Sequence, residues 1–264
     1  MKITFIHHSC FLAELDSVSL LFDYTEGELP PVHENNPLLV FASHRHGDHY
    51  SPEIFRLAQG HEAIRWILSF DIWRKRLPHE VWPFADSLKY NQQLSYQVKG
   101  GKVIPASEDQ SNIKVRAFRS TDEGVAFLIE ADGKVLYHGG DLNHWYWEGE
   151  DQNWNWSMGQ KYTRQIERLA ETLAERSVDA AFLPLDPRQE DAFYLGFHEF
   201  MEKIKVRFAF PMHCWGDFSV IERLKSMECS SEYRDRVIEI VKDGDAFVES
   251  FDGSAMVKVI GGSR

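Results

Sequence analysis

The sequence predicts an α/β protein in which two β-sheets lie between layers of helices. The first part of the chain reads as a meander of short strands, whereas the second half alternates helices with short, fully apolar strands. Strands of the second kind are typical of sheets that are covered on both faces. With 264 residues, the chain is long enough for one large α/β domain and too short for two comfortable ones. We therefore expect a single domain over residues 1–264.

The first half contains strand patterns separated by turn signals. Alternating or fully apolar runs predict strands at residues 2–6, 9–15, 19–22, 38–42 and 64–68. Residues 24–37 are rich in Pro, Glu and Asn and predict a loop. Ser51 and Pro52 are typical of a helix start, so we expect a helix to about Gln59, and Asp71 predicts the cap of a short helix through Leu77.

The signals are weaker from residue 78 to 114 and become clear again afterwards. The weak part predicts a string of short strands, and a meander follows at 113–118, 124–130 and 135–137, with a hairpin turn at Asp132-Gly133. Apolar spacing predicts helices at 163–176, 191–204 and 219–227. Buried strands are expected at 179–183 and 208–211, and residues 237–241 and 246–251 are expected to close the last sheet.

Composition narrows the classes of function. The formal net charge is −12, from 41 acidic and 29 basic residues, and this balance would repel a nucleic-acid backbone. No apolar run approaches a membrane span, and the opening residues resemble a strand rather than a signal peptide. The three cysteines are widely spaced and suggest reduced thiols. We expect a cytoplasmic protein with a small-molecule substrate and neither a nucleic-acid nor a membrane partner.

Four metal-ligand side chains follow the apolar strand at 38–42. His44, His46, Asp48 and His49 fall within six positions. Alternate side chains of a strand point to the same side, so His44 and His46 can converge on one ion, and a turn at Gly47 directs Asp48 and His49 to a second. Imidazole and carboxylate suit zinc and similar divalent ions. The simpler alternative is a solvated loop rich in histidine.

The pattern His44-x-His46-x-Asp48-His49 resembles the signature of the metallo-β-lactamase superfamily of metal-dependent hydrolases. The resemblance implies an αβ/βα four-layer sandwich with metal ligands at one end of the sheets. It also implies that His8 and Asp23 lie near the floor of the metal site, although both residues are equally compatible with ordinary turns.

Two further ligands come later in the chain. Gly139-Gly140-Asp141 follows an expected strand, and glycines let the backbone approach a metal closely. The resemblance implies that Asp141 bridges two ions and that His213 is the last ligand. It implies two divalent ions, with zinc preferred and manganese or iron as alternatives. Residues 179–184 and 210–213 further resemble the lactonase-like branch, which includes ascorbate-6-phosphate lactonase.

The sequence departs from the superfamily at one ligand. Members usually supply a third histidine to the first ion from a loop that corresponds to residues 118–124 of this chain. Residues 118–124 contain no histidine. Two outcomes are open. Either another group, with His144, Asp122 and Glu123 nearest in sequence, completes the first site, or one ion is held tightly at Asp48, His49, Asp141 and His213.

Four of the eight tryptophans lie between residues 145 and 156. Because this stretch follows Asp141 directly, we expect Trp145 and Trp147, with His144, to form a wall of the substrate pocket. The alternative is that these rings pack over a sheet edge or form a contact in a homo-oligomer.

Together these features predict a hydrolase of a small ester, lactone or phosphodiester that uses metal-activated water. Asp48 would bind the second ion and orient the nucleophile or pass a proton to the leaving group. No Gly-x-Ser-x-Gly elbow supports a serine nucleophile. The alternatives are a non-catalytic metal- or ligand-binding protein and an RNA-processing nuclease, which the acidic charge disfavours. A diiron redox role is disfavoured because such relatives usually carry Glu at the position of His46.

Overall fold

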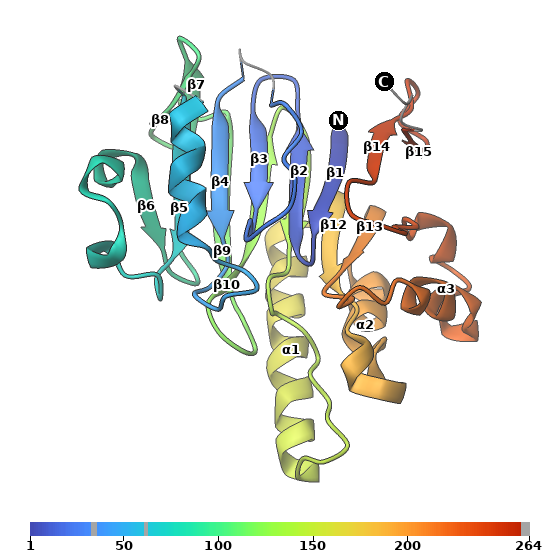
Figure 1. Cartoon of the computed structure of the whole chain (residues 1–264). Coiled ribbons are helices and arrows are strands. Elements are labelled where there is room, and N and C mark those ends of the chain that lie inside the picture. Colours follow the sequence, from blue (N-terminus) through green and yellow to red (C-terminus); the bar gives the residue numbers. More distant parts are fainter. Residues whose placement is uncertain (33–35, 61–62, 260–264) are drawn as a thin grey trace.

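Two mixed β-sheets form the centre of the protein (Figure 1). The computed structural model describes residues 1–32, 36–60 and 63–259. The expected arrangement of two mixed sheets with helices on their outer faces is confirmed.

The first sheet contains eight strands in the order β15-β14-β1-β2-β3-β4-β5-β6. Neighbours are antiparallel from β15 to β3 and parallel from β3 to β6. The strands are β1 (Lys2–His7), β2 (Cys10–Glu14), β3 (Ser19–Phe22), β4 (Leu38–Ala42), β5 (Ile64–Ser69), β6 (Ala85–Leu88), β14 (Ala246–Glu249) and β15 (Met256–Lys258).

The second sheet contains seven strands in the order β13-β12-β11-β10-β9-β7-β8. They are β7 (Gln93–Lys99), β8 (Lys102–Pro105), β9 (Ile113–Arg119), β10 (Val125–Ala131), β11 (Lys134–His138), β12 (Val178–Pro184) and β13 (Val206–Met212). The three strands β11, β12 and β13 run parallel. The predicted hairpin turn is confirmed, because Asp132 and Gly133 have φ of 51° and 73° and join β10 to β11.

The central strands of the first sheet are apolar on both faces because each face has its own core. In β4, Leu39 and Phe41 face the core shared by the two sheets, whereas Val40 faces an outer cluster. The 3₁₀ helix η1 (Pro52–Gly60) covers that outer cluster with Ile54 and Phe55 (Figure 1). This two-sided burial explains the uninterrupted apolar run in the sequence.

Helices pack on the second sheet and around the strand ends. The α-helices are α1 (Gln152–Leu173), α2 (Leu195–Lys203) and α3 (Ser219–Ser226), and the other 3₁₀ helices are η2 (Arg74–Arg76), η3 (His79–Phe84), η4 (Pro187–Ala192), η5 (Glu228–Ser230) and η6 (Arg234–Arg236). Helix α1 contacts β9 and α2 contacts β12. Within the described residues, no helix is both long and apolar enough to cross a membrane.

Helix α1 begins eleven residues earlier than expected, so the prediction of a helix from residue 163 was wrong at its start. The side chain of Asp151 caps the helix by accepting a hydrogen bond from the Asn153 amide at 2.8 Å. Asn155 donates to the Trp147 carbonyl at 2.8 Å and accepts from its amide at 3.0 Å. These tertiary contacts offset the weak helix propensity of this polar, aromatic segment.

Three other boundaries differ from the predictions. Residues 237–241 do not form a strand, since Val237 makes only an isolated bridge to Ala209. Helix α2 begins at Leu195, after the short η4. Asp71 does not cap a helix; its carboxylate instead accepts a hydrogen bond from the Arg45 amide at 3.2 Å and so braces the loop that carries His44 and His46.

Candidate metal centre

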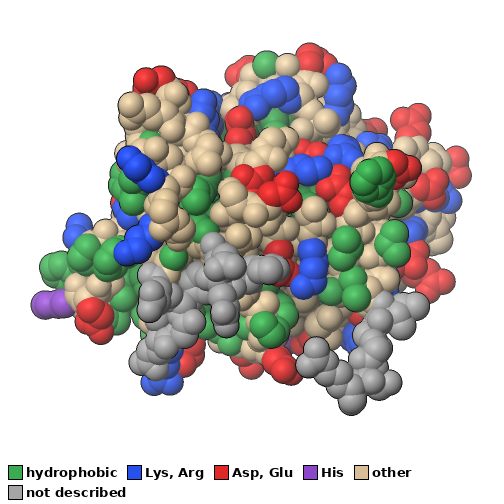
Figure 2. Space-filling view, turned by 90° about the horizontal axis from the view of Figure 1, so that it is seen from above, with side chains coloured by type: hydrophobic (Ala, Val, Ile, Leu, Met, Phe, Trp, Pro, Cys, Tyr) green, Lys and Arg blue, Asp and Glu red, His purple; other side chains and the backbone are tan. Residues whose placement is uncertain are grey.

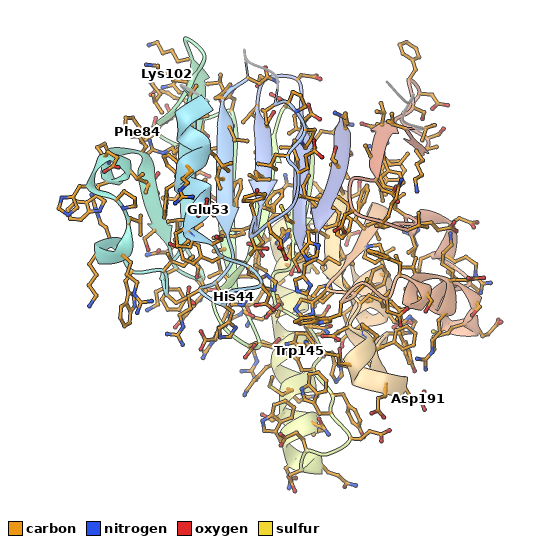
Figure 3. All side chains as sticks on the ribbon, viewed as in Figure 1. His44, Glu53, Phe84, Lys102, Trp145 and Asp191 are labelled. Atoms are coloured by element: carbon orange, nitrogen blue, oxygen red, sulfur yellow. The ribbon has the colours of Figure 1, made fainter. Side chains whose placement is uncertain are left out.

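The predicted ligands come together at one end of the two sheets. His8, Asp23 and His213 follow the strands β1, β3 and β13, and all three have positive φ, of 51°, 45° and 63°. Non-glycine residues rarely adopt this conformation, which stores backbone strain and is enriched at functional sites. Figure 3 places His44 and Trp145 at this same end of the sheets.

Asp141 lies at the centre of the cluster and connects histidines of both sheets. Its Oδ1 lies 3.0 Å from Nε2 of His49 and 3.4 Å from Nε2 of His213. Its Oδ2 lies 3.3 Å from Nε2 of His44. One carboxylate therefore faces three imidazoles, as a bridging ligand would.

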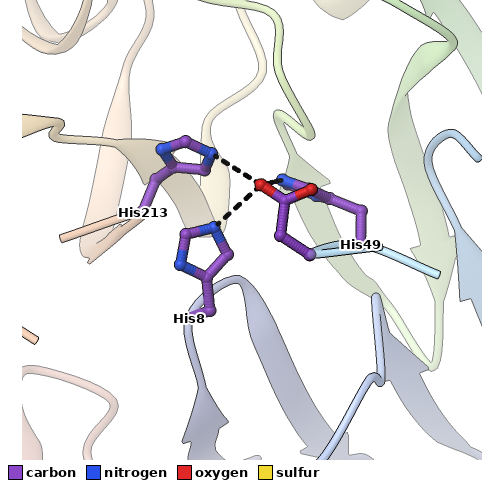
Figure 4. A group of neighbouring side chains, drawn as sticks. His8, His49 and His213 are labelled. Carbon is purple, nitrogen blue, oxygen red and sulfur yellow. Dashed lines mark ion pairs between the residues drawn. The ribbon is translucent and has the colours of Figure 1, made fainter. Parts of the chain in front are cut away.

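Asp48 is surrounded by a second group of imidazoles (Figure 4). Its Oδ2 lies 3.7 Å from Nε2 of His8, 3.9 Å from Nε2 of His213 and 4.0 Å from Nε2 of His49. One ligand atom from each of these four residues lies within 4.8 Å of all the others. His8 therefore joins the cluster and is not an isolated turn residue.

The histidine nitrogens that face the carboxylates lie close to them but form no hydrogen bond. Among the described residues, Nε2 of His8, His44, His49 and His213 and Oδ1 of Asp141 are buried without a hydrogen-bond partner. An unsatisfied buried polar atom costs about 1–3 kcal/mol, so five converging ones are expensive unless something binds them. Imidazole nitrogens and carboxylate oxygens are the ligands that zinc, manganese and iron accept. The residues present thus fit a divalent metal centre.

In His44, His49 and His213 the opposite ring nitrogen contacts a hydroxyl or carboxylate group. His49 Nδ1 donates to Asp23 at 2.7 Å and His213 Nδ1 donates to Asp186 at 2.9 Å. Such outer carboxylates fix the tautomer and orientation of metal-binding histidines. The sequence prediction missed Asp186, although its position after a strand end resembles that of Asp23.

Burial keeps two of the rings neutral. Burial, together with the imidazoles of His213 and His49, lowers the pKa of His8 to about 3. Burial and the imidazole of His49 lower the pKa of His44 to about 4. Because a metal binds the neutral ring, both histidines are in the binding form at pH 7 without first losing a proton.

Asp48 lines two cavities. One, of about 1040 Å³, is lined by His8, Tyr50 and Trp215, among other residues. The other, of about 260 Å³, is lined by Trp145, Trp147, Trp154, Met158 and Arg188 together with metal-cluster residues. The second cavity thus has an aromatic wall beside the predicted ligands.

The two tryptophans expected in this wall differ in burial. Trp145 is only 5% exposed and donates from its indole to the Asp141 carbonyl at 3.1 Å. Trp147 stacks on Trp145 with ring centroids 5.8 Å apart and is less buried. Trp145 therefore packs beneath the site as well as lining it, whereas Trp147 forms more of the open surface.

The structure does not bring His144 to the metal cluster or the cavity lining. Its Nδ1 lies 3.3 Å from Glu199 of α2, and its ring packs on Gly159 of α1. A Cβ at Gly159 would lie 2.6 Å from the His144 ring. Its contacts are those of a residue that joins α1 to α2.

A family model described as a beta-lactamase superfamily domain matches residues 2–152, which is more than half of the chain. The chain belongs to the beta-lactamase superfamily. His213 lies outside the matched residues, and it is the fold that brings it beside the ligands of the matched part.

Three similar proteins have low sequence identity to this chain. A protein from Korarchaeum cryptofilum, described as a UPF0173 metal-dependent hydrolase, is 26% identical over 160 residues, which cover 55% of this chain and 62% of that protein. The match therefore spans less than two thirds of the relative's length. Igni18, a metallo hydrolase from Ignicoccus hospitalis, shares the fold with a TM-score of 0.56 at 16% identity and covers 93% of this chain and 96% of its own. YhfI of Bacillus subtilis, a metallo-beta-lactamase fold protein, has a TM-score of 0.57 at 13% identity. The match covers 93% of this chain and 98% of YhfI.

Proposed function

We propose that this member of the superfamily is a metal-dependent hydrolase with a two-ion centre. His44, His46 and Asp141 would bind the first ion, and Asp48, His49, Asp141 and His213 the second. The proposal rests chiefly on the convergence of buried donor atoms that lack protein partners. His8 lies close enough to serve as a further donor at the second ion. The mixed nitrogen and oxygen set suits zinc best, and it also admits manganese or iron.

The ions and the side chains would divide the chemistry. Divalent ions, when bound, acidify water and polarise a scissile carbonyl or phosphoryl oxygen. Asp48 is the ligand best placed for proton transfer, because its side chain is 33% exposed and borders both cavities. We assign it to orienting the nucleophile or passing a proton to the leaving group.

The smaller cavity favours a small substrate with an apolar part and an anionic part. Trp147 and Trp154 supply flat apolar surface, and Arg188 supplies a cation. Arg188 is anchored by two nitrogens on Asp186, at 3.0 and 2.5 Å, and its guanidinium lies 4.2 Å from the Trp215 ring centroid. Its Nη1 makes no hydrogen bond to another described residue, so it can meet a carboxylate or phosphate.

We infer that the substrate is a small ester, lactone or phosphodiester, and a lactonase-like activity remains within this proposal. Nucleic acid is a poor candidate because the net charge is −12. Figure 2 shows the end of the molecule that lies away from His44 and Trp145, where acidic and basic side chains are interleaved. One domain, a reducing cytoplasmic location and three free thiols are compatible with this activity.

A panel of aryl esters, lactones and bis(aryl) phosphates, assayed with added zinc or manganese, tests the proposal. We expect turnover of at least one class that a chelator abolishes and that Asp48→Ala reduces by at least ~100-fold. If the chain binds two ions tightly but turns over none of these substrates, a non-catalytic metal-binding protein is the better description.

A further inference from the structure

We propose that Asp122 replaces the absent third histidine and completes the coordination of the first ion. The inference rests on the two-ion centre proposed above and adds a ligand to it. With His44, His46 and Asp141, the first ion would then have four protein donors.

The donor atoms converge at the outer side of the cluster. One ligand atom each from His46, Asp122 and Asp141 lies within 4.8 Å of the other two. Donors on one zinc-sized ion stand roughly 3–4 Å apart, so modest side-chain rotations would suffice. Nε2 of His44, which lies 3.3 Å from Oδ2 of Asp141, is buried and has no hydrogen-bond partner among the described residues.

The loop that carries Asp122 is fixed to both ligand segments. Gly124 has φ of 71°, and a Cβ there would lie 2.0 Å from the Ser43 carbonyl oxygen and 2.4 Å from the His44 Cβ. The Val125 amide donates to that same carbonyl at 2.9 Å. On the other side, the Thr121 hydroxyl donates to the Asn143 carbonyl at 2.6 Å. These contacts on both sides of Asp122 hold its loop against the segments that carry His44 and Asp141.

Asp122 fits the role better than its neighbour Glu123. Glu123 is paired through Oε1 with the Arg45 guanidinium at 2.8 Å. Its Oε2 lies 3.6 Å from Nε2 of His46, but Glu123 does not line the cavity beside the metal cluster. Asp122 lines that cavity, and its carboxylate accepts no hydrogen bond from any described residue. His144, the third candidate, is engaged with Glu199.

The substitution changes the character of the first site. Each ion would be held by two histidines and two carboxylates, with Asp141 counted in both sets. An oxygen donor in place of a nitrogen donor makes the first site harder and more negative, which shifts its preference towards manganese and iron(II) relative to a three-histidine site.

Metal stoichiometry in matched variants tests the assignment. Wild type, Asp122→Asn, Asp122→Ala, Asp122→His and the control Glu123→Gln would be loaded with cobalt(II), dialysed, and measured for ions per chain and for the cobalt electronic spectrum. We expect two ions in wild type, Glu123→Gln and Asp122→His, and one ion in the Asn and Ala variants. The Asp122→His spectrum should shift as a nitrogen donor is added.

Retention of two ions with an unchanged spectrum in Asp122→Ala would overturn the assignment, and so would loss of one ion in Glu123→Gln. Thermal melting of the metal-free forms checks that the variants fold alike. If the proposed function itself is wrong, the result appears in the wild type and not only in the variants. Wild type would then retain no ion, or would bind two ions and show no turnover.

Discussion

The imidazole of His49 and the carboxylate of Asp23 form a hydrogen bond of 2.7 Å in which both side chains are fully buried. The bond uses Nδ1 and leaves Nε2 facing Asp141 at 3.0 Å. Asp23 also accepts hydrogen bonds from the amide and hydroxyl of Ser43 at 2.7 and 2.6 Å. Asp23 therefore fixes the orientation of a predicted ligand of the second ion and the start of the His44 loop together.

Replacing Asp23 by Asn should weaken metal binding about 10–100-fold, the usual effect of removing a carboxylate behind a metal-binding histidine. Competition with a chromogenic chelator measures this change. Asp179→Asn is a suitable control because Asp179 pairs with Arg207, away from the metal cluster. Equal metal affinity in the Asp23 and Asp179 variants would contradict the positioning role.

Much of this end of the molecule is predictable from the sequence, because ligands follow recognisable strands. His44 and Asp48 lie in the loop after the apolar run 38–42, Asp141 follows Gly139-Gly140 at the end of a strand, and His213 follows the strand that ends at Met212. These strand ends meet at one edge of the sandwich. Asp186 was not predictable, because its role depends on which residue β12 and β13 place beside it. The pairing of β12 with β13 is a contact between distant parts of the chain, for which the sequence carries no local signal.

Trp145→Ala and Trp147→Ala should differ in their effect on stability. Trp145 is buried and bonded to the Asp141 carbonyl, so its truncation should lower the free energy of unfolding by about 3–5 kcal/mol. Trp147 is less buried, so its truncation should mainly raise KM. Urea denaturation and steady-state kinetics on both variants separate the effects, and equal destabilisation would show that Trp147 is also a packing residue.

The Trp-rich segment also shows where sequence reasoning failed. Its asparagines, serine and glycine predict no helix, yet α1 includes Trp154 and Trp156. The Asn155 side chain, bonded to the backbone of Trp147, holds this first turn in place. Tertiary hydrogen bonds of this kind override intrinsic propensity and leave no periodic pattern.

Arg188→Gln should raise the KM or inhibition constant of anionic ligands by at least ~10-fold, because a charge-assisted hydrogen bond is lost. Neutral esters of similar size should be affected much less. Binding of phosphate and of a short carboxylate, measured by competitive inhibition, provides the comparison. An equal loss of affinity for charged and neutral ligands would indicate that Arg188 acts only by holding Asp186.

Removing the metal should lower the thermal stability of the protein as well as its activity. Metal binding to the folded chain contributes RT ln(1 + [L]/Kd), about 4 kcal/mol at a thousandfold excess over Kd. Calorimetry before and after chelation, and after readdition of zinc or manganese, measures the effect. An unchanged melting temperature would argue against a tight site in the folded protein.

The most direct test of a two-ion hydrolytic centre is the metal content of exhaustively dialysed wild type and Asp141→Asn, measured by plasma mass spectrometry alongside turnover of the model substrates. For wild type we predict two ions per chain and metal-dependent turnover. Because Asp141 faces the ligands of both ions, we predict that Asp141→Asn loses the bound metal and the turnover. Wild type without bound ions, or full metal content and turnover in Asp141→Asn, would contradict the proposed centre.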